Sequence, residues 1–226
     1  MAARVMLAGA RAVYVGPSLA LEPHRNAVAT VAIALGTPFL LSFGEVFTSR
    51  RIALIPPNTR HHLRGTGPMA FVYLDALGDD YQAILATDLE VAYEQVDDVA
   101  GWDVARWCEA LGVPSRAAGD PRVAKAVRRL DARPQEFEHL ADLAAVVGLS
   151  PSRFHALFRR EVGMPFRRYR LWRRMAVVMR WVATGRSLTD AAHEAGFASS
   201  AHLSTTFRDM FGLPPSRLLH LNPTIV

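Results

Sequence analysis

The chain has 226 residues, half of them apolar, with one cysteine and a formal net charge of +5. Its length accommodates two small domains, and it contains neither an apolar run long enough to span a membrane nor the layout of a cleaved signal peptide. The composition therefore argues against a membrane protein, a disulfide framework or a cysteine-based zinc site, and it favours a cytoplasmic protein.

The charge is distributed unevenly. Residues 1–119 carry 9 arginines against 12 acidic residues, a net charge of −3, whereas residues 120–226 carry 17 basic against 9 acidic residues, a net charge of +8. A basic half joined to a weakly acidic half is typical of a polyanion-binding module attached to a module with another task.

Short apolar runs separated by turn signals fill the first 75 residues. The runs lie at 28–35, 39–43, 51–56 and 69–76, and sequences rich in glycine, proline and asparagine separate them. Runs of this length between such turns predict antiparallel strands in a sandwich or barrel.

Helical periodicity follows the strands. Segments 79–86 and 100–111 are predicted helices, the second with Val104, Trp107 and Leu111 on one face. This second helix could pack against the barrel or form the seam of a homodimer. The glycine, proline and serine residues of 112–121 predict a linker, after which the pattern is helical.

The helical half contains an internal repeat. Segments that begin at Leu143 and Ala191 align at an offset of 48 residues in their first part and 49 in their second, so one extra residue lies in the second turn. Each unit has a small residue in a first helix, a glycine in a turn and a serine before a second helix with apolar residues at helical spacing. The repeat predicts two helix-turn-helix units. An ordinary helical bundle is the alternative, disfavoured by the Arg, Ser, Thr and His residues opposite the predicted core.

A long helix is predicted between the two units, at residues 165–184. Twenty helical residues span roughly 30 Å. This length is close to the roughly 34 Å repeat of B-DNA, so one chain could place two recognition helices in successive major grooves.

These residues resemble the AraC/XylS family of bacterial transcription regulators. The resemblance covers about residues 139–219 and includes F-R-x-x-x-G-x-P after each recognition helix and A-G-F before the second one. It implies an α+β multidomain protein: a cupin-like β-barrel with trailing helices for sensing or dimerisation at 1–111, the linker at 112–121, and an all-α DNA-binding domain with two helix-turn-helix units at 122–226. The implied function is sequence-specific transcription regulation, without enzymatic activity or a cofactor.

The resemblance also implies DNA-contacting residues. The expected base readers are Ser152, His155 and Ala156 in the first recognition helix, and Ser200, His202, Ser204 and Thr205 in the second. The expected phosphate contacts are Ser150, Arg153, Arg159 and Arg208.

Two departures bear on base reading. The family commonly has an arginine where Thr205 stands and a polar residue where Ala156 stands, so bidentate contact to guanine is missing there. His155 and His202 could equally be surface histidines that touch phosphate or water. An interaction protein whose units no longer read DNA therefore remains an alternative.

The first half offers weaker signals. Residues 56–61 resemble the second cupin motif, and Glu22-Pro23-His24 resembles a remnant of the first. A metal on His24, His61 and His62, and with it a cupin-type enzyme fused to a DNA-binding domain, is a minority alternative, because such a site wants three convergent ligands that usually include a carboxylate. We expect no metal and instead an apolar effector pocket, with candidate residues His24, His61, Phe43, Phe71 and Tyr73.

The expected partners are double-stranded promoter DNA and a small-molecule effector, with RNA polymerase and a second copy of the chain as further candidates and no membrane. The sequence leaves open whether transcription rises or falls.

Overall fold

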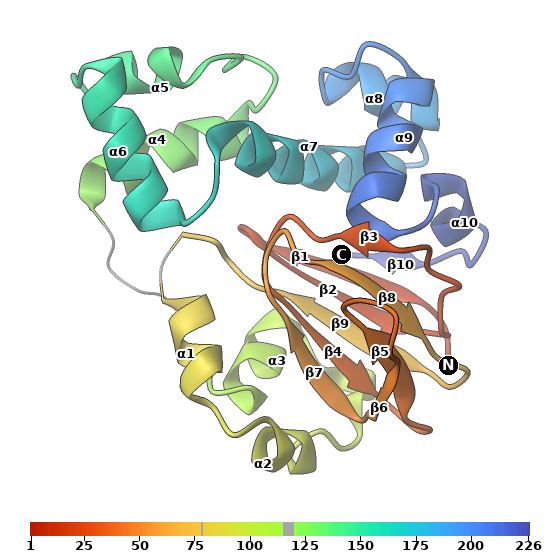
Figure 1. Ribbon diagram of the computed structural model, residues 1–226. Helices are drawn as coiled ribbons and strands as arrows, with labels where there is room; N and C mark the ends of the chain where they lie inside the picture. Colours follow the sequence, from red (N-terminus) through yellow and green to blue (C-terminus); the bar gives the residue numbers. More distant parts are fainter. Residues whose placement is uncertain (78, 115–119) are drawn as a thin grey trace.

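The computed structural model describes residues 1–77, 79–114 and 120–226, which form a β-rich N-terminal part and a helical C-terminal part (Figure 1). We call strands β1–β9 the β domain. Their bounds are β1 Arg4–Ala8, β2 Arg11–Gly16, β3 His24–Arg25, β4 Thr30–Ala34, β5 Phe39–Ser42, β6 Thr48–Arg50, β7 Ile52–Ile55, β8 Arg60–Arg64 and β9 Met69–Tyr73.

Two sheets face each other in the β domain. The larger has the strand order β10-β1-β2-β9-β4-β7, in which β10 (Thr224–Ile225) comes from the end of the chain, and the smaller has β3-β8-β5-β6. All four apolar runs predicted as strands contain one, β4, β5, β7 and β9 respectively. The hairpin of β1 and β2 was not predicted, because its arginines obscure the pattern. Arg4 and Arg11 lie at the starts of these two strands and are only partly buried, and Gly9 turns the chain with φ of 59°.

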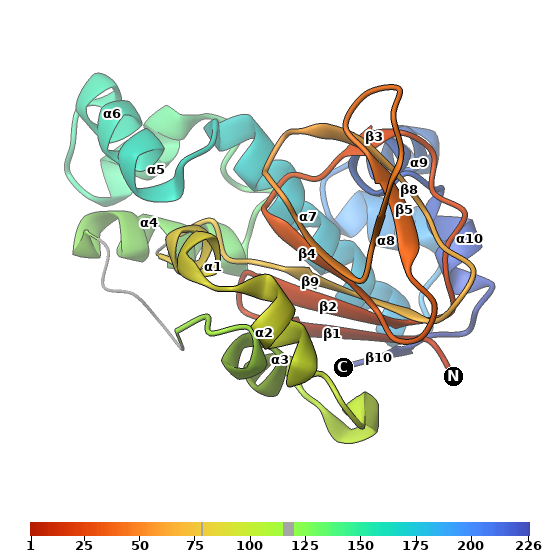
Figure 2. The same cartoon turned by 60° about the horizontal axis from the view of Figure 1, so that its bottom comes forward.

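The larger sheet is buried on both faces, which explains why β4 shows no alternation of apolar and polar residues. One face, with Val13, Val31 and Val72, packs under α1 (Asp80–Ala86), α2 (Leu89–Glu94), the 3-10 turn Val99–Gly101 and α3 (Val104–Ala110). These helices gather on one side of the sheet (Figure 2). Predicted helix 79–86 is α1, whereas predicted helix 100–111 is shortened to α3 because residues 99–101 form the separate 3-10 turn.

The C-terminal part consists of helices, bounded as α4 Pro121–Ala132, α5 Leu140–Val146, α6 Pro151–Val162, α7 Phe166–Ala183, α8 Leu188–Glu194, α9 Ser200–Phe211 and α10 Pro215–Leu219. The helix predicted at 165–184 is α7, which joins the helix-turn-helix pair α5–α6 to the pair α8–α9. We call the first pair together with α4 the first unit, and the second pair together with α10 the second unit.

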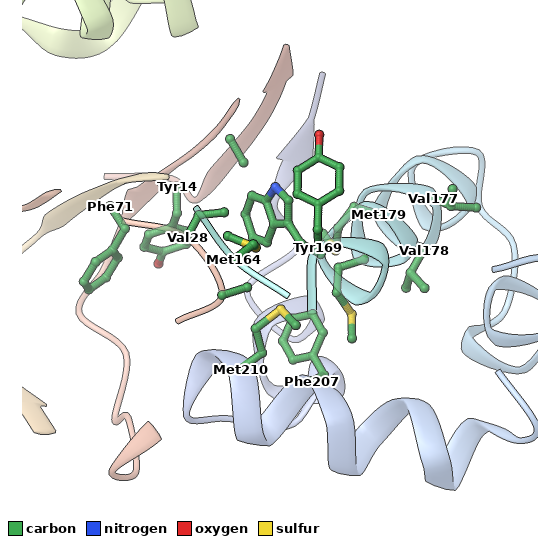
Figure 3. Close-up of a cluster of buried hydrophobic side chains, with 14 of the residues drawn as sticks. Tyr14, Val28, Phe71, Met164, Tyr169, Val177, Val178, Met179, Phe207 and Met210 are labelled. Carbon is green, nitrogen blue, oxygen red and sulfur yellow. The ribbon is translucent and has the colours of Figure 1, made fainter. Parts of the chain in front are cut away.

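The two parts share one core. Tyr14 and Phe71 of the larger sheet belong to the same buried cluster as Met179 of α7 and Phe207 of α9 (Figure 3). Strand β10 (Thr224–Ile225) returns from the helical part and pairs in parallel with β1. The predicted division at 112–121 therefore describes the order of the chain but not separate cores, and residues 115–119 of that predicted linker lie outside the described residues.

Candidate DNA-binding surface and effector cavity

The first recognition helix is α6. It starts at Ser150, whose Oγ accepts a hydrogen bond from the Arg153 backbone N–H (3.4 Å), and it ends at Gly163 with φ of 70°. Phe154, Leu157 and Phe158 are buried and hold the helix against its unit. The opposite face presents residues at i, i+4 and i+7, namely Ser152, Ala156 and Arg159, with His155 and Arg160 beside them; all five are exposed.

The second recognition helix, α9, repeats this construction. Ser199 Oγ accepts from the His202 backbone N–H (3.1 Å), and Gly212 ends the helix with φ of 75°. Leu203 and Phe207 face the core. Exposed Ala201, Thr205 and Arg208 occupy the i, i+4 and i+7 positions that correspond to Ser152, Ala156 and Arg159.

The predicted base readers of α9 do not share one face. His202 is exposed on one flank of the outward face, where its ring packs edge-on against Phe197 with centroids 5.4 Å apart. Ser200 and Ser204 lie on the other flank and are half-buried. Ala201 and Asp209 are also exposed on this helix, but the sequence analysis did not include them among the DNA-contacting residues. The offset of 49 residues from Ser152 and Arg160 identifies their positions.

Two consecutive arginines of α7 fix one unit each. Arg173 is 3% exposed and forms an ion pair with Asp131 of α4 in the first unit. Arg174 is 5% exposed; its Nε donates to the Ala195 carbonyl (2.6 Å), and its guanidinium lies 3.8 Å from the Phe197 ring centroid in the second unit. The turn of the second unit is thereby tied to the same stretch of α7 as the first.

The second unit is also docked onto the β domain. The Glu22 backbone N–H donates to the Gly212 carbonyl (2.7 Å), and Arg217 donates to the Ala20 carbonyl (3.2 Å). A Cβ on Gly212 would lie 2.6 Å from both the Glu22 carbonyl oxygen and His24 Nδ1, so only glycine permits this approach.

An apolar cavity of about 80 Å³ lies at this junction, between the larger sheet and helices α7, α9 and α10. Phe71 and Tyr73, two of the residues expected in an effector pocket, line this cavity together with Trp172, Met175 and Phe211. Arg11 and Arg173 are the cationic residues of its wall. Arg11 forms a bidentate ion pair with Asp80, and Arg173 Nη1 is buried with no hydrogen-bond partner in the part of the chain that the structure describes.

The other three residues expected in an effector pocket do not line this cavity. Phe43 follows β5 at the surface and is 53% exposed. His24 and His61 pair across β3 and β8 with ring centroids 4.2 Å apart, and neither lines the cavity. Sequence reasoning grouped them with Phe71 and Tyr73 because it could not assign residues to one sheet or the other.

The histidines also fail to form the minority metal site. His61 and His62 are consecutive in β8, so their side chains point to opposite faces of the sheet, and His62 packs against Phe47 instead. Among the described residues no three His, Cys, Asp or Glu side chains converge on one point. Burial is the main cause that lowers the pKa of His24 to about 4, and it also lowers the pKa of His61, so both rings are neutral near pH 7.

The C-terminal part is similar to known proteins. Residues 143–220 match the helix-turn-helix domain family. An AraC-like transcription regulator from Streptomyces lividans is 33% identical over 97 residues, covering 42% of this chain and 32% of that protein. The transcriptional regulator GbdR from Pseudomonas aeruginosa is 25% identical over 177 residues, covering 77% of this chain and 47% of GbdR. The chain thus spans less than half the length of these relatives.

Among solved structures, the fold matches ToxT from Vibrio cholerae with unsaturated fatty acid bound. The TM-score is 0.53 at 14% identity, over 92% of this chain and 94% of ToxT. The two-part architecture of a β-rich domain and two helical units is therefore shared along nearly the whole of both chains. No helix within the described ranges is long and apolar enough to cross a membrane.

Proposed function

We propose that the chain is a sequence-specific DNA-binding transcription regulator of the AraC type, controlled by a small molecule bound beside the β domain. The match of residues 143–220 to a helix-turn-helix domain and the AraC-like relative support this proposal. One observation carries the proposal: two recognition helices with exposed outward faces at corresponding positions are held on a single helix. The 18 residues of α7 span roughly 27 Å at 1.5 Å per residue, somewhat less than one turn of B-DNA.

The outward faces suggest which residues read DNA. Ser152 and His155 of α6 and His202 and Thr205 of α9 offer hydrogen bonds to base edges, and Ala156 offers only a methyl group for the thymine methyl. Half-buried Ser200 and Ser204 are expected to contribute less. We expect Arg153, Arg159, Arg208 and Ser150 to contact phosphates.

The test is selection of binding sites from random duplex DNA with the full chain, followed by footprinting of the selected duplex. We expect two protected half-sites about one helical turn apart. Equal affinity for selected and random duplexes would instead support the interaction-protein alternative.

The cavity favours a slender, mostly apolar effector with an anionic end. Its walls are apolar apart from the two arginines, and Arg173 Nη1 is available for a carboxylate. At about 80 Å³ it is smaller than sites for drug-sized ligands, which span roughly 300–1,000 Å³, so a longer ligand has to separate α9 and α10 from the sheet. The unsaturated fatty acid bound to ToxT has this chemistry.

Oleate is a suitable probe of this site. Trp172 lines the cavity and donates from Nε1 to the Ala10 carbonyl (3.0 Å), so its fluorescence should change on binding. Ala176→Phe places a ring in the cavity and should abolish the change. The same response in Ala176→Phe and in the unsubstituted protein would show that oleate binds elsewhere.

A further inference from the structure

A wide groove separates the two recognition helices. Its volume is about 940 Å³, with His155 of α6 on one wall and His202 and Thr206 of α9 on the other. The floor is the outer face of α7, and the loop from Gln135 to Leu140 forms one rim. The two histidines that border the proposed base-reading faces therefore also line the groove.

Three arginines form the floor of this groove. Arg167, Arg170 and Arg174 follow one another at i, i+3 and i+7 on α7, and they pass from exposed through half-buried to buried. Arg170 Nε donates to the Pro134 carbonyl (3.0 Å), which fixes that side chain in place. Like charges on one helical face destabilise the helix, so this arrangement favours binding of a polyanion that neutralises them.

Burial intensifies the positive field. Desolvation, followed by the charge of Arg170, lowers the pKa of Arg174 to about 10, and both side chains remain protonated near neutral pH. Glu138 is the only acidic residue that lines the groove among the described residues, and Asp142 acts on Arg170 from nearby. Arg174 Nη2 is buried with no hydrogen-bond partner in the described part of the chain.

We propose that this groove receives the DNA backbone between the two half-sites, and that Arg167 contacts its phosphates. The inference rests on the proposed function. If α6 and α9 enter successive major grooves on one side of the duplex, the minor groove between them faces α7. Its two flanking strands then pass over the arginine floor, where Arg167 is the exposed member.

This geometry makes the spacer a determinant of specificity that no base contact reads. A·T-rich tracts narrow the minor groove and strengthen its negative potential, which attracts arginine. The protein should therefore prefer an A·T-rich spacer to a G·C-rich one when both half-sites are unchanged, and Arg167 should carry much of that preference.

The test uses the full chain and a duplex obtained by selection, remade with an A·T-rich or a G·C-rich spacer. Arg167→Gln should lower affinity for the A·T-rich duplex about tenfold, reduce the slope of log affinity against log salt by about 1, and shrink the ratio between the two duplexes. Arg128→Gln is the matched control, because Arg128 is exposed on α4 and does not line the groove.

Several outcomes would overturn the inference. Arg167→Gln could bind both duplexes with the affinity of the unsubstituted protein, or Arg128→Gln could lose as much affinity as Arg167→Gln. In a third outcome, inorganic phosphate at constant ionic strength raises the unfolding midpoint of the unsubstituted protein but not that of Arg167→Gln, and the spacer does not change the affinity for DNA. The groove would then be a site for small anions. Failure to select any duplex would instead overturn the proposed function. Near-ultraviolet circular dichroism confirms that each variant folds.

Discussion

The two helix-turn-helix units share a construction but differ in what holds them. The first unit packs on itself and on α7, where Asp131 meets Arg173. The second is attached to α7 through Arg174 and is also docked on the β domain through Gly212 and Arg217. We therefore expect the proposed effector to act on the second recognition helix directly and, among the described residues, on the first mainly through α7.

Their outward faces differ too. The first recognition helix carries Arg153, Arg159 and Arg160, the last of which forms an ion pair with Glu161, whereas the second carries Arg208 as its only arginine, next to the acidic Asp209. Phosphate contacts supply affinity that is independent of sequence. We therefore expect the first unit to supply most of the affinity and the second, whose position depends on the β domain, to make that affinity conditional on the effector.

The largest expected effect is loss of the attachment of the first unit. Asp131→Ala leaves Arg173 buried without its carboxylate, which should lower the free energy of unfolding by about 3 kcal/mol. Urea denaturation measures it. The double variant Asp131→Leu with Arg173→Met is the control, because an apolar pair restores packing without a stranded charge. A single variant as stable as the unsubstituted protein would show that the pair contributes nothing.

The docking of the second unit can be isolated with two glycines. Gly163→Ala and Gly212→Ala both place alanine at positive φ at the end of a recognition helix, at a cost of about 1–2 kcal/mol. Only at Gly212 does the new Cβ meet the β domain, so the free energy of unfolding of this variant should fall by a further 1–3 kcal/mol or so in the same denaturation experiment. In footprinting, Gly212→Ala should weaken protection of the second half-site alone. Equal losses at the two glycines would mean that the docking is loose.

Acid should also weaken the docking. The pKa of His24 is lowered from 6.5 to about 4 in the folded chain, so between these values the unfolded chain binds more protons and stability falls as pH falls. From pH 6.5 to pH 5 we expect a loss of about 2 kcal/mol from this group, measured by urea denaturation at each pH. His24→Gln should flatten the dependence, and His220→Gln, at an exposed position, should not. A slope unchanged in His24→Gln would assign the acid sensitivity to another group.

The smallest effects concern single phosphate contacts. Arg159→Ala and Arg208→Ala should each weaken binding to all duplexes alike and reduce the salt slope by about 1. His155→Ala should instead change which bases are preferred. Fluorescence anisotropy with the selected duplex and its point variants at several salt concentrations measures both. If His155→Ala weakens every duplex equally, that side chain contacts phosphate rather than bases.

Sequence reasoning was strongest for the helical half because its signals are local. The repeated glycines, capping serines and apolar spacing each act within one or two turns of helix, so two helix-turn-helix units were predicted, and α7 was predicted nearly to its ends. The strands β4, β5, β7 and β9 were found for the same reason. The β1–β2 hairpin was missed, since arginines at the starts of both strands interrupt the apolar pattern.

The candidate sites show the limit of local signals. Phe71 and Tyr73 line the cavity, but Phe43, His24 and His61 do not join them, because neighbours in a sheet depend on strand order rather than on sequence distance. The same holds for the arginines of α7. Their spacing revealed a helix, but only packing decided that Arg173 faces Asp131, that Arg174 holds the second unit and that Arg167 faces the groove.

The sequence by itself determined a basic helical half with two recognition helices, joined by a helix of about one DNA turn, behind a β-rich half. The tertiary structure decided how the halves are coupled: β10 added to the larger sheet, Gly212 seated against Glu22, and an apolar cavity between the sheet and the second unit. The physical reason is the distance along the sequence between the residues that interact. Caps and periodicity act between residues close in the chain, whereas these contacts join residues about 190–220 positions apart.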